Sequence, residues 1–316
     1  MSLDLVRRAV RGFLAERPRQ DFAVAVSGGA DSLALAEASA YVARKTGVRV
    51  RALVVDHGLQ EGSADVAAQA AAQARELGVD AAEVLTVEVT GAGGMEAAAR
   101  RARYAALSSA DAGLVLLGHT RDDQAETVLL GLGRGSGPRS IAGMKPFDPP
   151  WGRPLLDVPR SATRQACAEL GVRPWEDPHN SDPRFRRSRL RAEVLPLLED
   201  VLSGGVAAAL ARTAAQLRED VETLDELAEG LRGTEDTLDA KALAGVPAAL
   251  RRRVLRRWLL DAGACDLTDA HLRSVDDLVG KWRGQGGVWL PGSLVVERTH
   301  GRLAMDRRER REVRGE

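Results

Sequence analysis

Four short apolar runs alternate with amphipathic stretches in the first half of the chain, and this alternation constrains the fold most strongly. The runs are FAVAV (22–26), VRVRALVV (48–55), VLTVEV (84–89) and LVLLG (114–118). Between and after them lie stretches of helical periodicity, at 33–45, 64–77, 95–108 and 122–132. Strands that alternate with helices of this length predict βαβ units, and therefore an α/β fold with a parallel sheet.

The second half of the chain has a different pattern. Helical periodicity predicts helices at about 161–170 and 186–198, and then at 206–231, 247–261 and 268–279. The terminal stretch GGVWLPGSLVVERTHGRLAM has turn dipeptides between short strands, which is typical of a small antiparallel ribbon. We interpret SGG at 203–205 as a linker. The sequence therefore predicts a catalytic domain over 1–200 and a mainly helical domain over 201–316.

Composition excludes several classes of protein. No apolar run approaches membrane-spanning length, and the two cysteines, Cys167 and Cys265, lie outside any CxxC spacing. We therefore expect a cytoplasmic protein with no membrane association, no disulfide framework and no cysteine-based metal site. The formal net charge is +0, so any surface for nucleic acid must be local.

The stretch SGGADS (27–32) follows the first predicted strand and precedes a helix. Glycines let the backbone approach a ligand closely, and successive N–H groups at a helix N-terminus favour an anion. Neither GxxxxGK[ST] nor GxGxxG is present, which argues against γ-phosphoryl transfer and against dinucleotide binding. Taken alone, the stretch is also compatible with a simple turn.

Two further polar motifs, DHGLQEG and GHTRDDQAET, each follow a strand of their own. Ligands of parallel sheets bind beyond the carboxyl ends of the strands, so all three motifs are expected on one rim. Helical spacing places Asp122 with Glu126, and Asp123 with Glu126, on one face. Such acids can hold a metal or an amine; a capped helix with a solvated first turn would explain the same pattern.

These residues resemble a known family. SGGxDS after the first strand is the fingerprint of the PP-loop ATP-pyrophosphatases, whose fold is a doubly wound, mostly parallel sheet. Within that superfamily the chain resembles the tRNA(Ile)-lysidine synthetases. The resemblance covers about 200 residues and rests on VDHGL, GHTRDDQAETVLLGLGRGSG, EAAARRARY, RPLLDVPR and PWEDPHNSDPRFRRSRLRAEVLP. The length fits a short form without the family's second C-terminal module.

The resemblance implies a ligase. ATP adenylates the C2 oxygen of the wobble cytidine in the isoleucine tRNA with a CAU anticodon, and L-lysine then displaces AMP to give lysidine. The implied ATP-binding residues are Ser27, Gly28, Gly29, Ala30, Asp31, Ser32 and His57. The implied catalytic residues are Asp31, His119, Asp123 and Glu126, with His119 as a phosphate contact or proton acceptor. Asp31 and Asp123 are the implied Mg²⁺ ligands.

Arginines provide the predicted tRNA contacts, which are Arg100, Arg103, Arg184, Arg187, Arg191, Arg251 and Arg252. RFRRSRLR (184–191) and RRRVLRR (251–257) each hold five Arg, and such patches contact phosphates. Only four of the 45 basic residues are Lys, so 41 are Arg, and a general preference for Arg would also explain the patches. The family pattern RFxRNxIR is broken by Ser188 in place of Asn, and Ala192 replaces the usual His.

Tryptophans and cysteines separate the remaining interpretations. Trp175 is expected either to stack on a base or to be buried, and Trp258, Trp282 and Trp289 are expected in the core of the C-terminal domain. A tRNA 2-thiolase needs a persulfide or an iron–sulfur cluster, which two cysteines remote from the three motifs disfavour.

An amide-forming synthetase and a non-catalytic adenine-nucleotide sensor are also conceivable. The synthetase leaves the Arg-rich stretch at 184–191 unexplained, and the sensor has no need of the acids at 122–126. The oligomeric state stays open, with a homodimer as one option.

Overall fold

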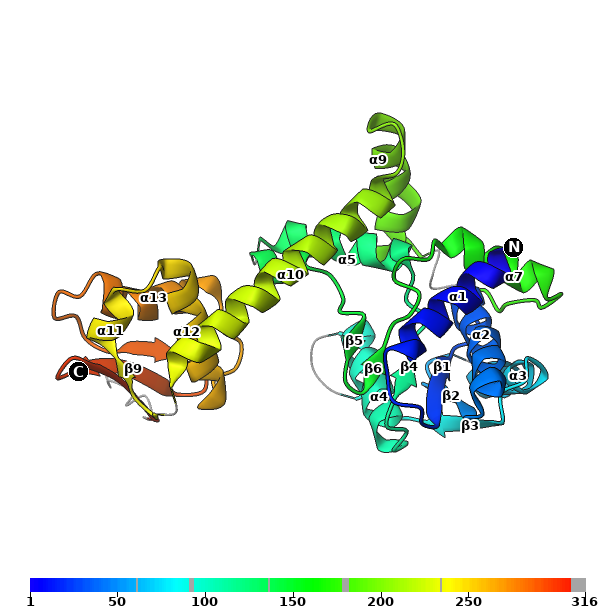
Figure 1. The fold of residues 1–316 in the computed structure, drawn as a ribbon, viewed down its shortest axis with the longest axis horizontal. Coiled ribbons are helices and arrows are strands. Elements are labelled where there is room, and N and C mark those ends of the chain that lie inside the picture. The colour runs from blue at the N-terminus through cyan, green and yellow to red at the C-terminus, as the bar shows by residue number, and fades with distance from the viewer. Residues whose placement is uncertain (61, 91–93, 136, 178–181, 234, 308–316) are drawn as a thin grey trace, which may run out of the picture. The chain divides into compact units, whose positions relative to one another are not determined.

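The computed structural model describes the 316-residue chain except for residues 61, 91–93, 136, 178–181, 234 and 308–316. It divides the chain into two compact units (Figure 1). The N-terminal unit comprises Met1–Gly133 and Gly143–Ala215; the C-terminal unit comprises Arg134–Ala142 and the chain from Gln216 onward. The segment Arg134–Ala142 therefore belongs to the C-terminal unit, although it lies within the first half of the sequence.

A six-stranded sheet in the order β3-β2-β1-β4-β6-β5 forms the centre of the N-terminal unit (Figure 1). The strands are β1 (Phe22–Val26), β2 (Val50–Asp56), β3 (Ala81–Thr86), β4 (Val115–Leu116), β5 (Phe147–Asp148) and β6 (Trp151–Gly152). All neighbouring pairs are parallel except β5 with β6. The predicted mostly parallel sheet is confirmed.

The helices of this unit cover both faces of the sheet, because successive residues of a strand point to opposite sides. Phe22, Val24 and Val26 enter a core with α1, α2, α3 and α7, whereas Ala23 packs with Leu107 of α4 on the other face. The helices are α1 (Ser2–Ala15), α2 (Ala30–Thr46), α3 (Ser63–Glu76), α4 (Met95–Ser109), α5 (Arg121–Arg134) and α7 (Arg160–Glu169). The sheet is therefore doubly wound, as the family resemblance implied.

Two predicted boundaries differ from the structure. β3 lies three residues earlier than the predicted run 84–89, because its pairing with Arg51–Asp56 of β2 decides where an edge strand begins and ends. The predicted helix over 186–198 is three joined segments: α8 (Arg186–Arg189), a π-helical segment (Leu190–Val194) and α9 (Leu195–Val201). The SGG sequence at 203–205 then separates α9 from α10 (Val206–Arg232).

Among the described residues, no single helix is both long and apolar enough to cross a membrane. One bent pair, Arg186–Val201 with Val206–Arg232, passes that criterion by length and composition only.

The C-terminal unit combines helices with a four-stranded antiparallel sheet in the order β7-β10-β9-β8. Its elements are α6 (Pro138–Ile141), β7 (Leu238–Asp239), α11 (Ala240–Ala244), α12 (Ala248–Asp261), α13 (Asp269–Gly280), β8 (Val288–Leu290), β9 (Leu294–Thr299) and β10 (Arg302–Arg307). Leu255 and Leu259 of α12 pack with Leu278 of α13 and with Val296 of β9 in one core. The predicted helices and terminal ribbon are present, and the two-residue strand β7 was not predicted.

Candidate active site

The glycine loop, residues 27–32, connects β1 to α2. Gly28 has a φ of +80°, and a Cβ there would lie 3.3 Å from Cβ of Ala70, so glycine suits both the backbone and the space. The backbone N–H of Ser27 donates to Oγ of Ser32 at 3.1 Å, and that hydroxyl donates to the carbonyl of Gly29 at 2.9 Å. Ser32 therefore holds the loop in shape, while the first N–H groups of α2 lack intrahelical partners.

Asp31 lies in the first turn of α2, with Thr163 and Arg160 of α7 beside it. Oδ1 of Asp31 accepts a hydrogen bond from the Thr163 hydroxyl, and Nε of Arg160 lies 3.6 Å from Oδ2. Burial raises the pKa of Asp31, and the neighbouring Asp123 carboxylate raises it further, while Thr163 and Arg160 oppose the shift. Two carboxylates, Asp31 and Asp123, thus converge from different helices.

The first turns of α5 supply the other acids. The backbone N–H and the hydroxyl of Thr120 donate to Oδ2 of Asp123 at 2.8 and 2.7 Å. Burial disfavours the ionised form of Asp123, but Arg160 and the Thr120 N–H outweigh it and lower the pKa. Glu126 is buried with 0% exposure, whereas Asp122 accepts from the backbone N–H of Arg160 at 2.8 Å.

Two arginines lie among these acids. Arg160 contacts Oδ1 of Asp123 at 2.6 Å and Oε1 of Glu126 at 3.2 Å, and Nε of Arg191 lies 2.9 Å from Oε1 of Glu126. We call this group the acid cluster; it comprises Asp31, Asp122, Asp123 and Glu126 with Arg160 and Arg191. Four carboxylates surround two guanidiniums, so the cluster has an excess of negative charge that a bound cation would offset.

His119 and His57 lie beyond the carboxyl ends of β4 and β2. Burial lowers the pKa of His119 to about 3; the Asp123 carboxylate opposes this shift and Arg103 and other guanidiniums assist it, so His119 is neutral at pH 7. Burial, with Arg103, also lowers the pKa of His57. Nδ1 of each His and Nε of Arg103 are buried, and none has a hydrogen-bond partner in the described part of the chain. Unsatisfied buried polar atoms beside arginines are typical of an anion site.

Tyr104 of α4 lies among three arginines, Arg100, Arg103 and Arg153. Arg100 donates to its hydroxyl at 3.3 Å, and burial opposes ionisation of the phenol, whereas Arg100, Arg103 and Arg153 together lower its pKa. Its ring packs edge-on against Trp151 at 4.8 Å between centroids. Arg153 is buried, with 7% exposure, and was not predicted from the sequence.

The predicted tRNA-contacting arginines fall into different settings. Arg100 is exposed, and Arg103, Arg187 and Arg252 are half-buried. Arg184 is exposed and pairs with Asp182 at 2.7 Å, whereas Arg191 belongs to the acid cluster.

Arg251 requires a correction. It is 9% exposed and forms a bidentate ion pair with Asp276, with Nε 2.6 Å from Oδ1. It lies on the buried face of α12 with Val254, Leu255 and Trp258, so its guanidinium does not face RNA. Arg251, Val254, Leu255 and Trp258 have the spacing i, i+3, i+4, i+7 of one helix face, and this spacing already indicated that Arg251 is buried.

Two further expectations were wrong in part. Trp258 is buried as expected, but Trp282 and Trp289 are 38% and 42% exposed. Cys167 is not remote from the motifs, because α7 packs against α2 and the thiol lies 3.4 Å from the carbonyl of Ala30 in the glycine loop. Burial raises the pKa of Cys167 to about 11, so the thiol stays protonated and is unsuited to sulfur transfer.

Arg160 and Thr163 were missed although RPLLDVPR, which ends at Arg160, was recognised as a motif. Their contacts with Asp31 span more than 120 residues, and no local pattern reports such a pairing. Trp175 is half-buried, and its backbone N–H donates to the carbonyl of Gly28 at 3.0 Å, which ties the 173–177 loop to the glycine loop.

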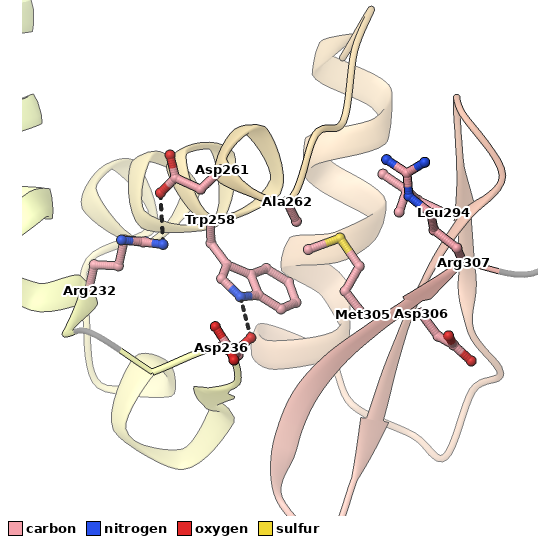
Figure 2. Close-up of a pocket in the computed structure, with 9 residues that line it drawn as sticks. All are labelled: Arg232, Asp236, Trp258, Asp261, Ala262, Leu294, Met305, Asp306 and Arg307. Carbon is pink, nitrogen blue, oxygen red and sulfur yellow. Dashed lines mark hydrogen bonds and ion pairs between the residues drawn. The ribbon is translucent and has the colours of Figure 1, made fainter.

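A separate cavity of about 280 Å³ lies in the C-terminal unit (Figure 2). Trp258 and Met305 line it, and its charged Arg232 and Asp261 form an ion pair at 2.7 Å. The indole N–H of Trp258 donates to the carbonyl of Asp236 at 2.8 Å. The lining also includes Asp236, Asp306 and Arg307, and the cavity lies in the C-terminal unit, apart from the glycine loop and the acid cluster of the N-terminal unit.

The described residues contain no group of three or more His, Cys, Asp or Glu side chains arranged to hold a metal ion. A nucleotide-bound Mg²⁺ does not need such a group, because it takes one or two carboxylates together with phosphate oxygens and waters. The pair Asp31 and Asp123 meets this smaller requirement.

Comparisons with known proteins agree with this geometry. A model of the PP-loop domain family matches residues 3–198, and a model of the TilS substrate binding domain matches residues 238–304. The tRNA(Ile)-lysidine synthase of Rhodococcus jostii is 60% identical over 98% of this chain and 97% of its own. That of Nocardia farcinica is 59% identical over 98% of this chain and 100% of its own.

A solved structure shares the fold. The U34-tRNA thiolase NcsA of Methanococcus maripaludis, solved with its iron–sulfur cluster, superposes with a TM-score of 0.57 over 69% of this chain and 80% of its own. The two sequences are 18% identical. This likeness supports the architecture of the sheet and its helices and nothing about the reaction.

Proposed function

This chain belongs to the tRNA(Ile)-lysidine synthase family, and from that membership we propose how its residues join lysine to the wobble cytidine of the tRNA. The enzyme uses ATP to adenylate the C2 oxygen of the cytidine in the CAU anticodon. The amine of L-lysine then attacks C2 and displaces AMP. Pyrophosphate and AMP are the released products. Adenylation is needed because a carbonyl oxygen leaves poorly until it is a phosphate ester.

The glycine loop binds the phosphates of ATP through backbone N–H groups. Gly28 has a positive φ and no space for a side chain beside Ala70, which fixes the path of the loop backbone, and the N-terminus of the 17-residue helix α2 adds a favourable dipole. The hydroxyl of Ser32 stabilises the loop through its hydrogen bonds with Ser27 and Gly29. The proposed ATP contacts come from residues 27–32 of the loop and from His57, which follows β2.

Asp31 and Asp123 are the proposed Mg²⁺ ligands. Their carboxylates are near enough for the charge of Asp123 to raise the pKa of Asp31, and carboxylate oxygen is the donor that Mg²⁺ prefers. When bound, Mg²⁺ neutralises charge on the phosphates of ATP. Thr163 and Arg160 orient Asp31 for this role.

The acid cluster recognises the lysine side chain. The observation that carries this proposal is the charge imbalance, with four carboxylates around two guanidiniums and Glu126 fully buried. An ammonium in the cluster offsets part of the negative excess, and carboxylates are its natural acceptors. Lysine must then lose a proton before its neutral amine attacks C2.

His119 contributes a neutral imidazole. A group with a pKa of about 3 accepts a proton poorly at neutral pH, so we favour the phosphate contact over the proton acceptor. Arg100 and Arg103, together with Arg153, contact phosphate groups of the tRNA or of ATP. Arg184, Arg187, Arg191 and Arg252 complete the proposed tRNA contacts; the buried Arg251 does not belong to that set.

We further propose a division of labour along the chain. Residues 1–200 perform the ATP chemistry and contribute tRNA contacts of their own, and residues 201–316 form a mainly helical domain that binds tRNA, in a protein of the cytoplasm. The match of the substrate binding domain to residues 238–304 supports this division.

The test is to incubate the protein with ATP, Mg²⁺, labelled lysine and tRNA transcripts. Label should enter the isoleucine tRNA with the CAU anticodon, with AMP and pyrophosphate released in equal amounts. A transcript whose wobble cytidine is replaced by uridine is the matched control and should stay unlabelled. Release of ADP, or label in no tRNA, would refute the proposal.

A further inference from the structure

One carboxylate of the C-terminal unit, that of Asp225 on α10, binds two arginines that lie far apart in the sequence. Nη1 of Arg253 on α12 donates to Oδ1 of Asp225 at 2.6 Å. Arg139 of α6 donates to the same oxygen. Arg139 comes from the segment Arg134–Ala142, which the fold assigns to the C-terminal unit.

Arg256 lies next to this pair and carries a third charge. It is half-buried; burial lowers its pKa, Arg139 lowers it further, and Asp225 opposes the shift. Within the part of the chain that the structure describes, Arg256 makes no ion pair of its own. We call Arg139, Arg253 and Arg256 around Asp225 the arginine cluster: three guanidiniums share one carboxylate.

The other paired arginines of α12 are balanced. Arg251 has Asp276 to itself in a bidentate pair. Arg257 lies between Asp261 at 3.1 Å and Glu229 at 3.9 Å. A purely structural role requires this kind of pairing, because a half-buried charge without a partner is costly. The arginine cluster instead has, by the contacts of the described residues, three guanidiniums and one carboxylate, an excess of two positive charges.

We propose that the arginine cluster binds phosphodiester groups of the tRNA backbone. The planar guanidinium matches two phosphate oxygens at once, which makes arginine better suited than lysine to this contact. A phosphate supplies the negative charge that Arg256 lacks. The proposal rests on the proposed function, because it takes tRNA as the substrate. It assigns the phosphate contacts of RRRVLRR to Arg253 and Arg256 in place of Arg251.

The test measures binding of the full-length protein to the CAU isoleucine tRNA transcript between about 50 and 200 mM salt, a range in which phosphate contacts change affinity by roughly 10³-fold or more. Arg256→Gln and Arg139→Gln should each weaken binding about tenfold and reduce the slope of log K against log salt by about 1. The KM for tRNA should rise by a similar factor, while kcat at saturating tRNA stays within about twofold. The matched control is Arg257→Gln, one position along the same helix, which should keep the wild-type slope because its charge is already neutralised.

Asp225→Asn separates binding from a structural role. Removing the one carboxylate leaves the guanidiniums free for phosphate, so tRNA should bind several-fold more tightly at low salt while the melting temperature falls. Weaker binding by this variant would overturn the proposal. So would a wild-type affinity and salt slope for Arg256→Gln.

Lysine incorporation by the wild-type protein distinguishes failure at the arginine cluster from failure of the proposed function. If the wild type labels the tRNA but the arginine variants keep its affinity and salt slope, only the arginine cluster proposal fails. If the wild type labels no tRNA, the proposed function itself fails.

Discussion

Four carboxylates surround two guanidiniums in the acid cluster, whereas three guanidiniums surround one carboxylate in the arginine cluster. Both groups are partly buried, and both mix the same residue types. They differ in the sign of the charge that is left over. Between these extremes is the pair Arg251–Asp276, where one guanidinium meets one carboxylate at 2.6 Å with both side chains about 10% exposed.

The ratio of acids to arginines therefore distinguishes the two proposed binding sites from the Arg251–Asp276 pair, which residue type alone does not. A balanced buried pair has its desolvation offset by its partner, so it needs nothing further. An unbalanced cluster is stable only to the extent that solvent or a ligand supplies the missing charge. On this basis the acid cluster suits a cation and the arginine cluster suits an anion.

The largest expected effect comes from removing one charge of the acid cluster at the glycine loop. Asp31→Asn keeps the shape of the side chain but loses a proposed Mg²⁺ ligand, so AMP release with tRNA should fall by about 10³-fold or more. Asp122→Asn is the matched control, because Asp122 accepts from the backbone N–H of Arg160, a bond that an amide oxygen can also accept. It should lose less than about tenfold. Near-normal turnover of Asp31→Asn would eliminate the metal role.

Breaking the balanced pair should affect stability instead of catalysis. Asp276→Ala leaves Arg251 buried without a partner, which typically costs about 3–5 kcal/mol. The melting transition of the C-terminal unit should fall accordingly, while the salt slope for tRNA stays at the wild-type value. The double variant Arg251→Met with Asp276→Leu should recover most of the loss. A changed slope in a folded Arg251→Met protein would show that this arginine does contact RNA.

A smaller effect, confined to one half-reaction, is expected at Glu126. Glu126→Gln removes negative charge from the centre of the acid cluster, so lysine transfer should slow by about 100-fold, equivalent to about 2.7 kcal/mol. Adenylation of the tRNA without lysine should be far less affected, which rapid-quench measurement of the adenylated intermediate can check. Equal losses in both steps would argue against lysine recognition by Glu126.

Much of the fold could be predicted because its signals are local. The run FAVAV coincides with β1, and the glycines and hydroxyls that follow it form the loop where they were expected. Asp123 and Glu126 of α5 contact the same guanidinium, that of Arg160, because a spacing of three residues places them on one face of the helix.

What the sequence did not reveal depends on distant packing. Arg160 and Thr163 reach Asp31 across more than 120 residues, and Arg139 joins Asp225 across 86. Composition also gave no signal for the arginine cluster, because 41 of the 45 basic residues are arginines and no single arginine stands out from the others. Arg251 differs from Arg256 because Arg251 has a carboxylate of its own, that of Asp276, whereas Arg256 shares Asp225 with two other arginines. These contacts form only in the folded chain.

The smallest expected effect is on pH dependence, and it tests whether burial, assisted by arginines, keeps His119 neutral. The pKa of His119 falls from an ordinary 6.5 to about 3 in the folded chain, so between these values the unfolded state binds the extra proton. Stability should therefore be constant above pH 6.5 and fall as the pH drops below it, by up to about 2 kcal/mol at about pH 5. The partial exposure of His119 reduces that figure, and His57 adds in the same direction.

His119→Asn isolates the contribution. Between about pH 7 and 5 the variant should lose less stability than the wild type, and the His119 ring resonances of the wild type should not titrate above about pH 5. Pyrophosphate, which adds negative charge beside the arginines, should raise the midpoint. A midpoint near 6.5 without ligand would mean that burial and the neighbouring arginines together do not keep His119 neutral, which would contradict the structure of this site.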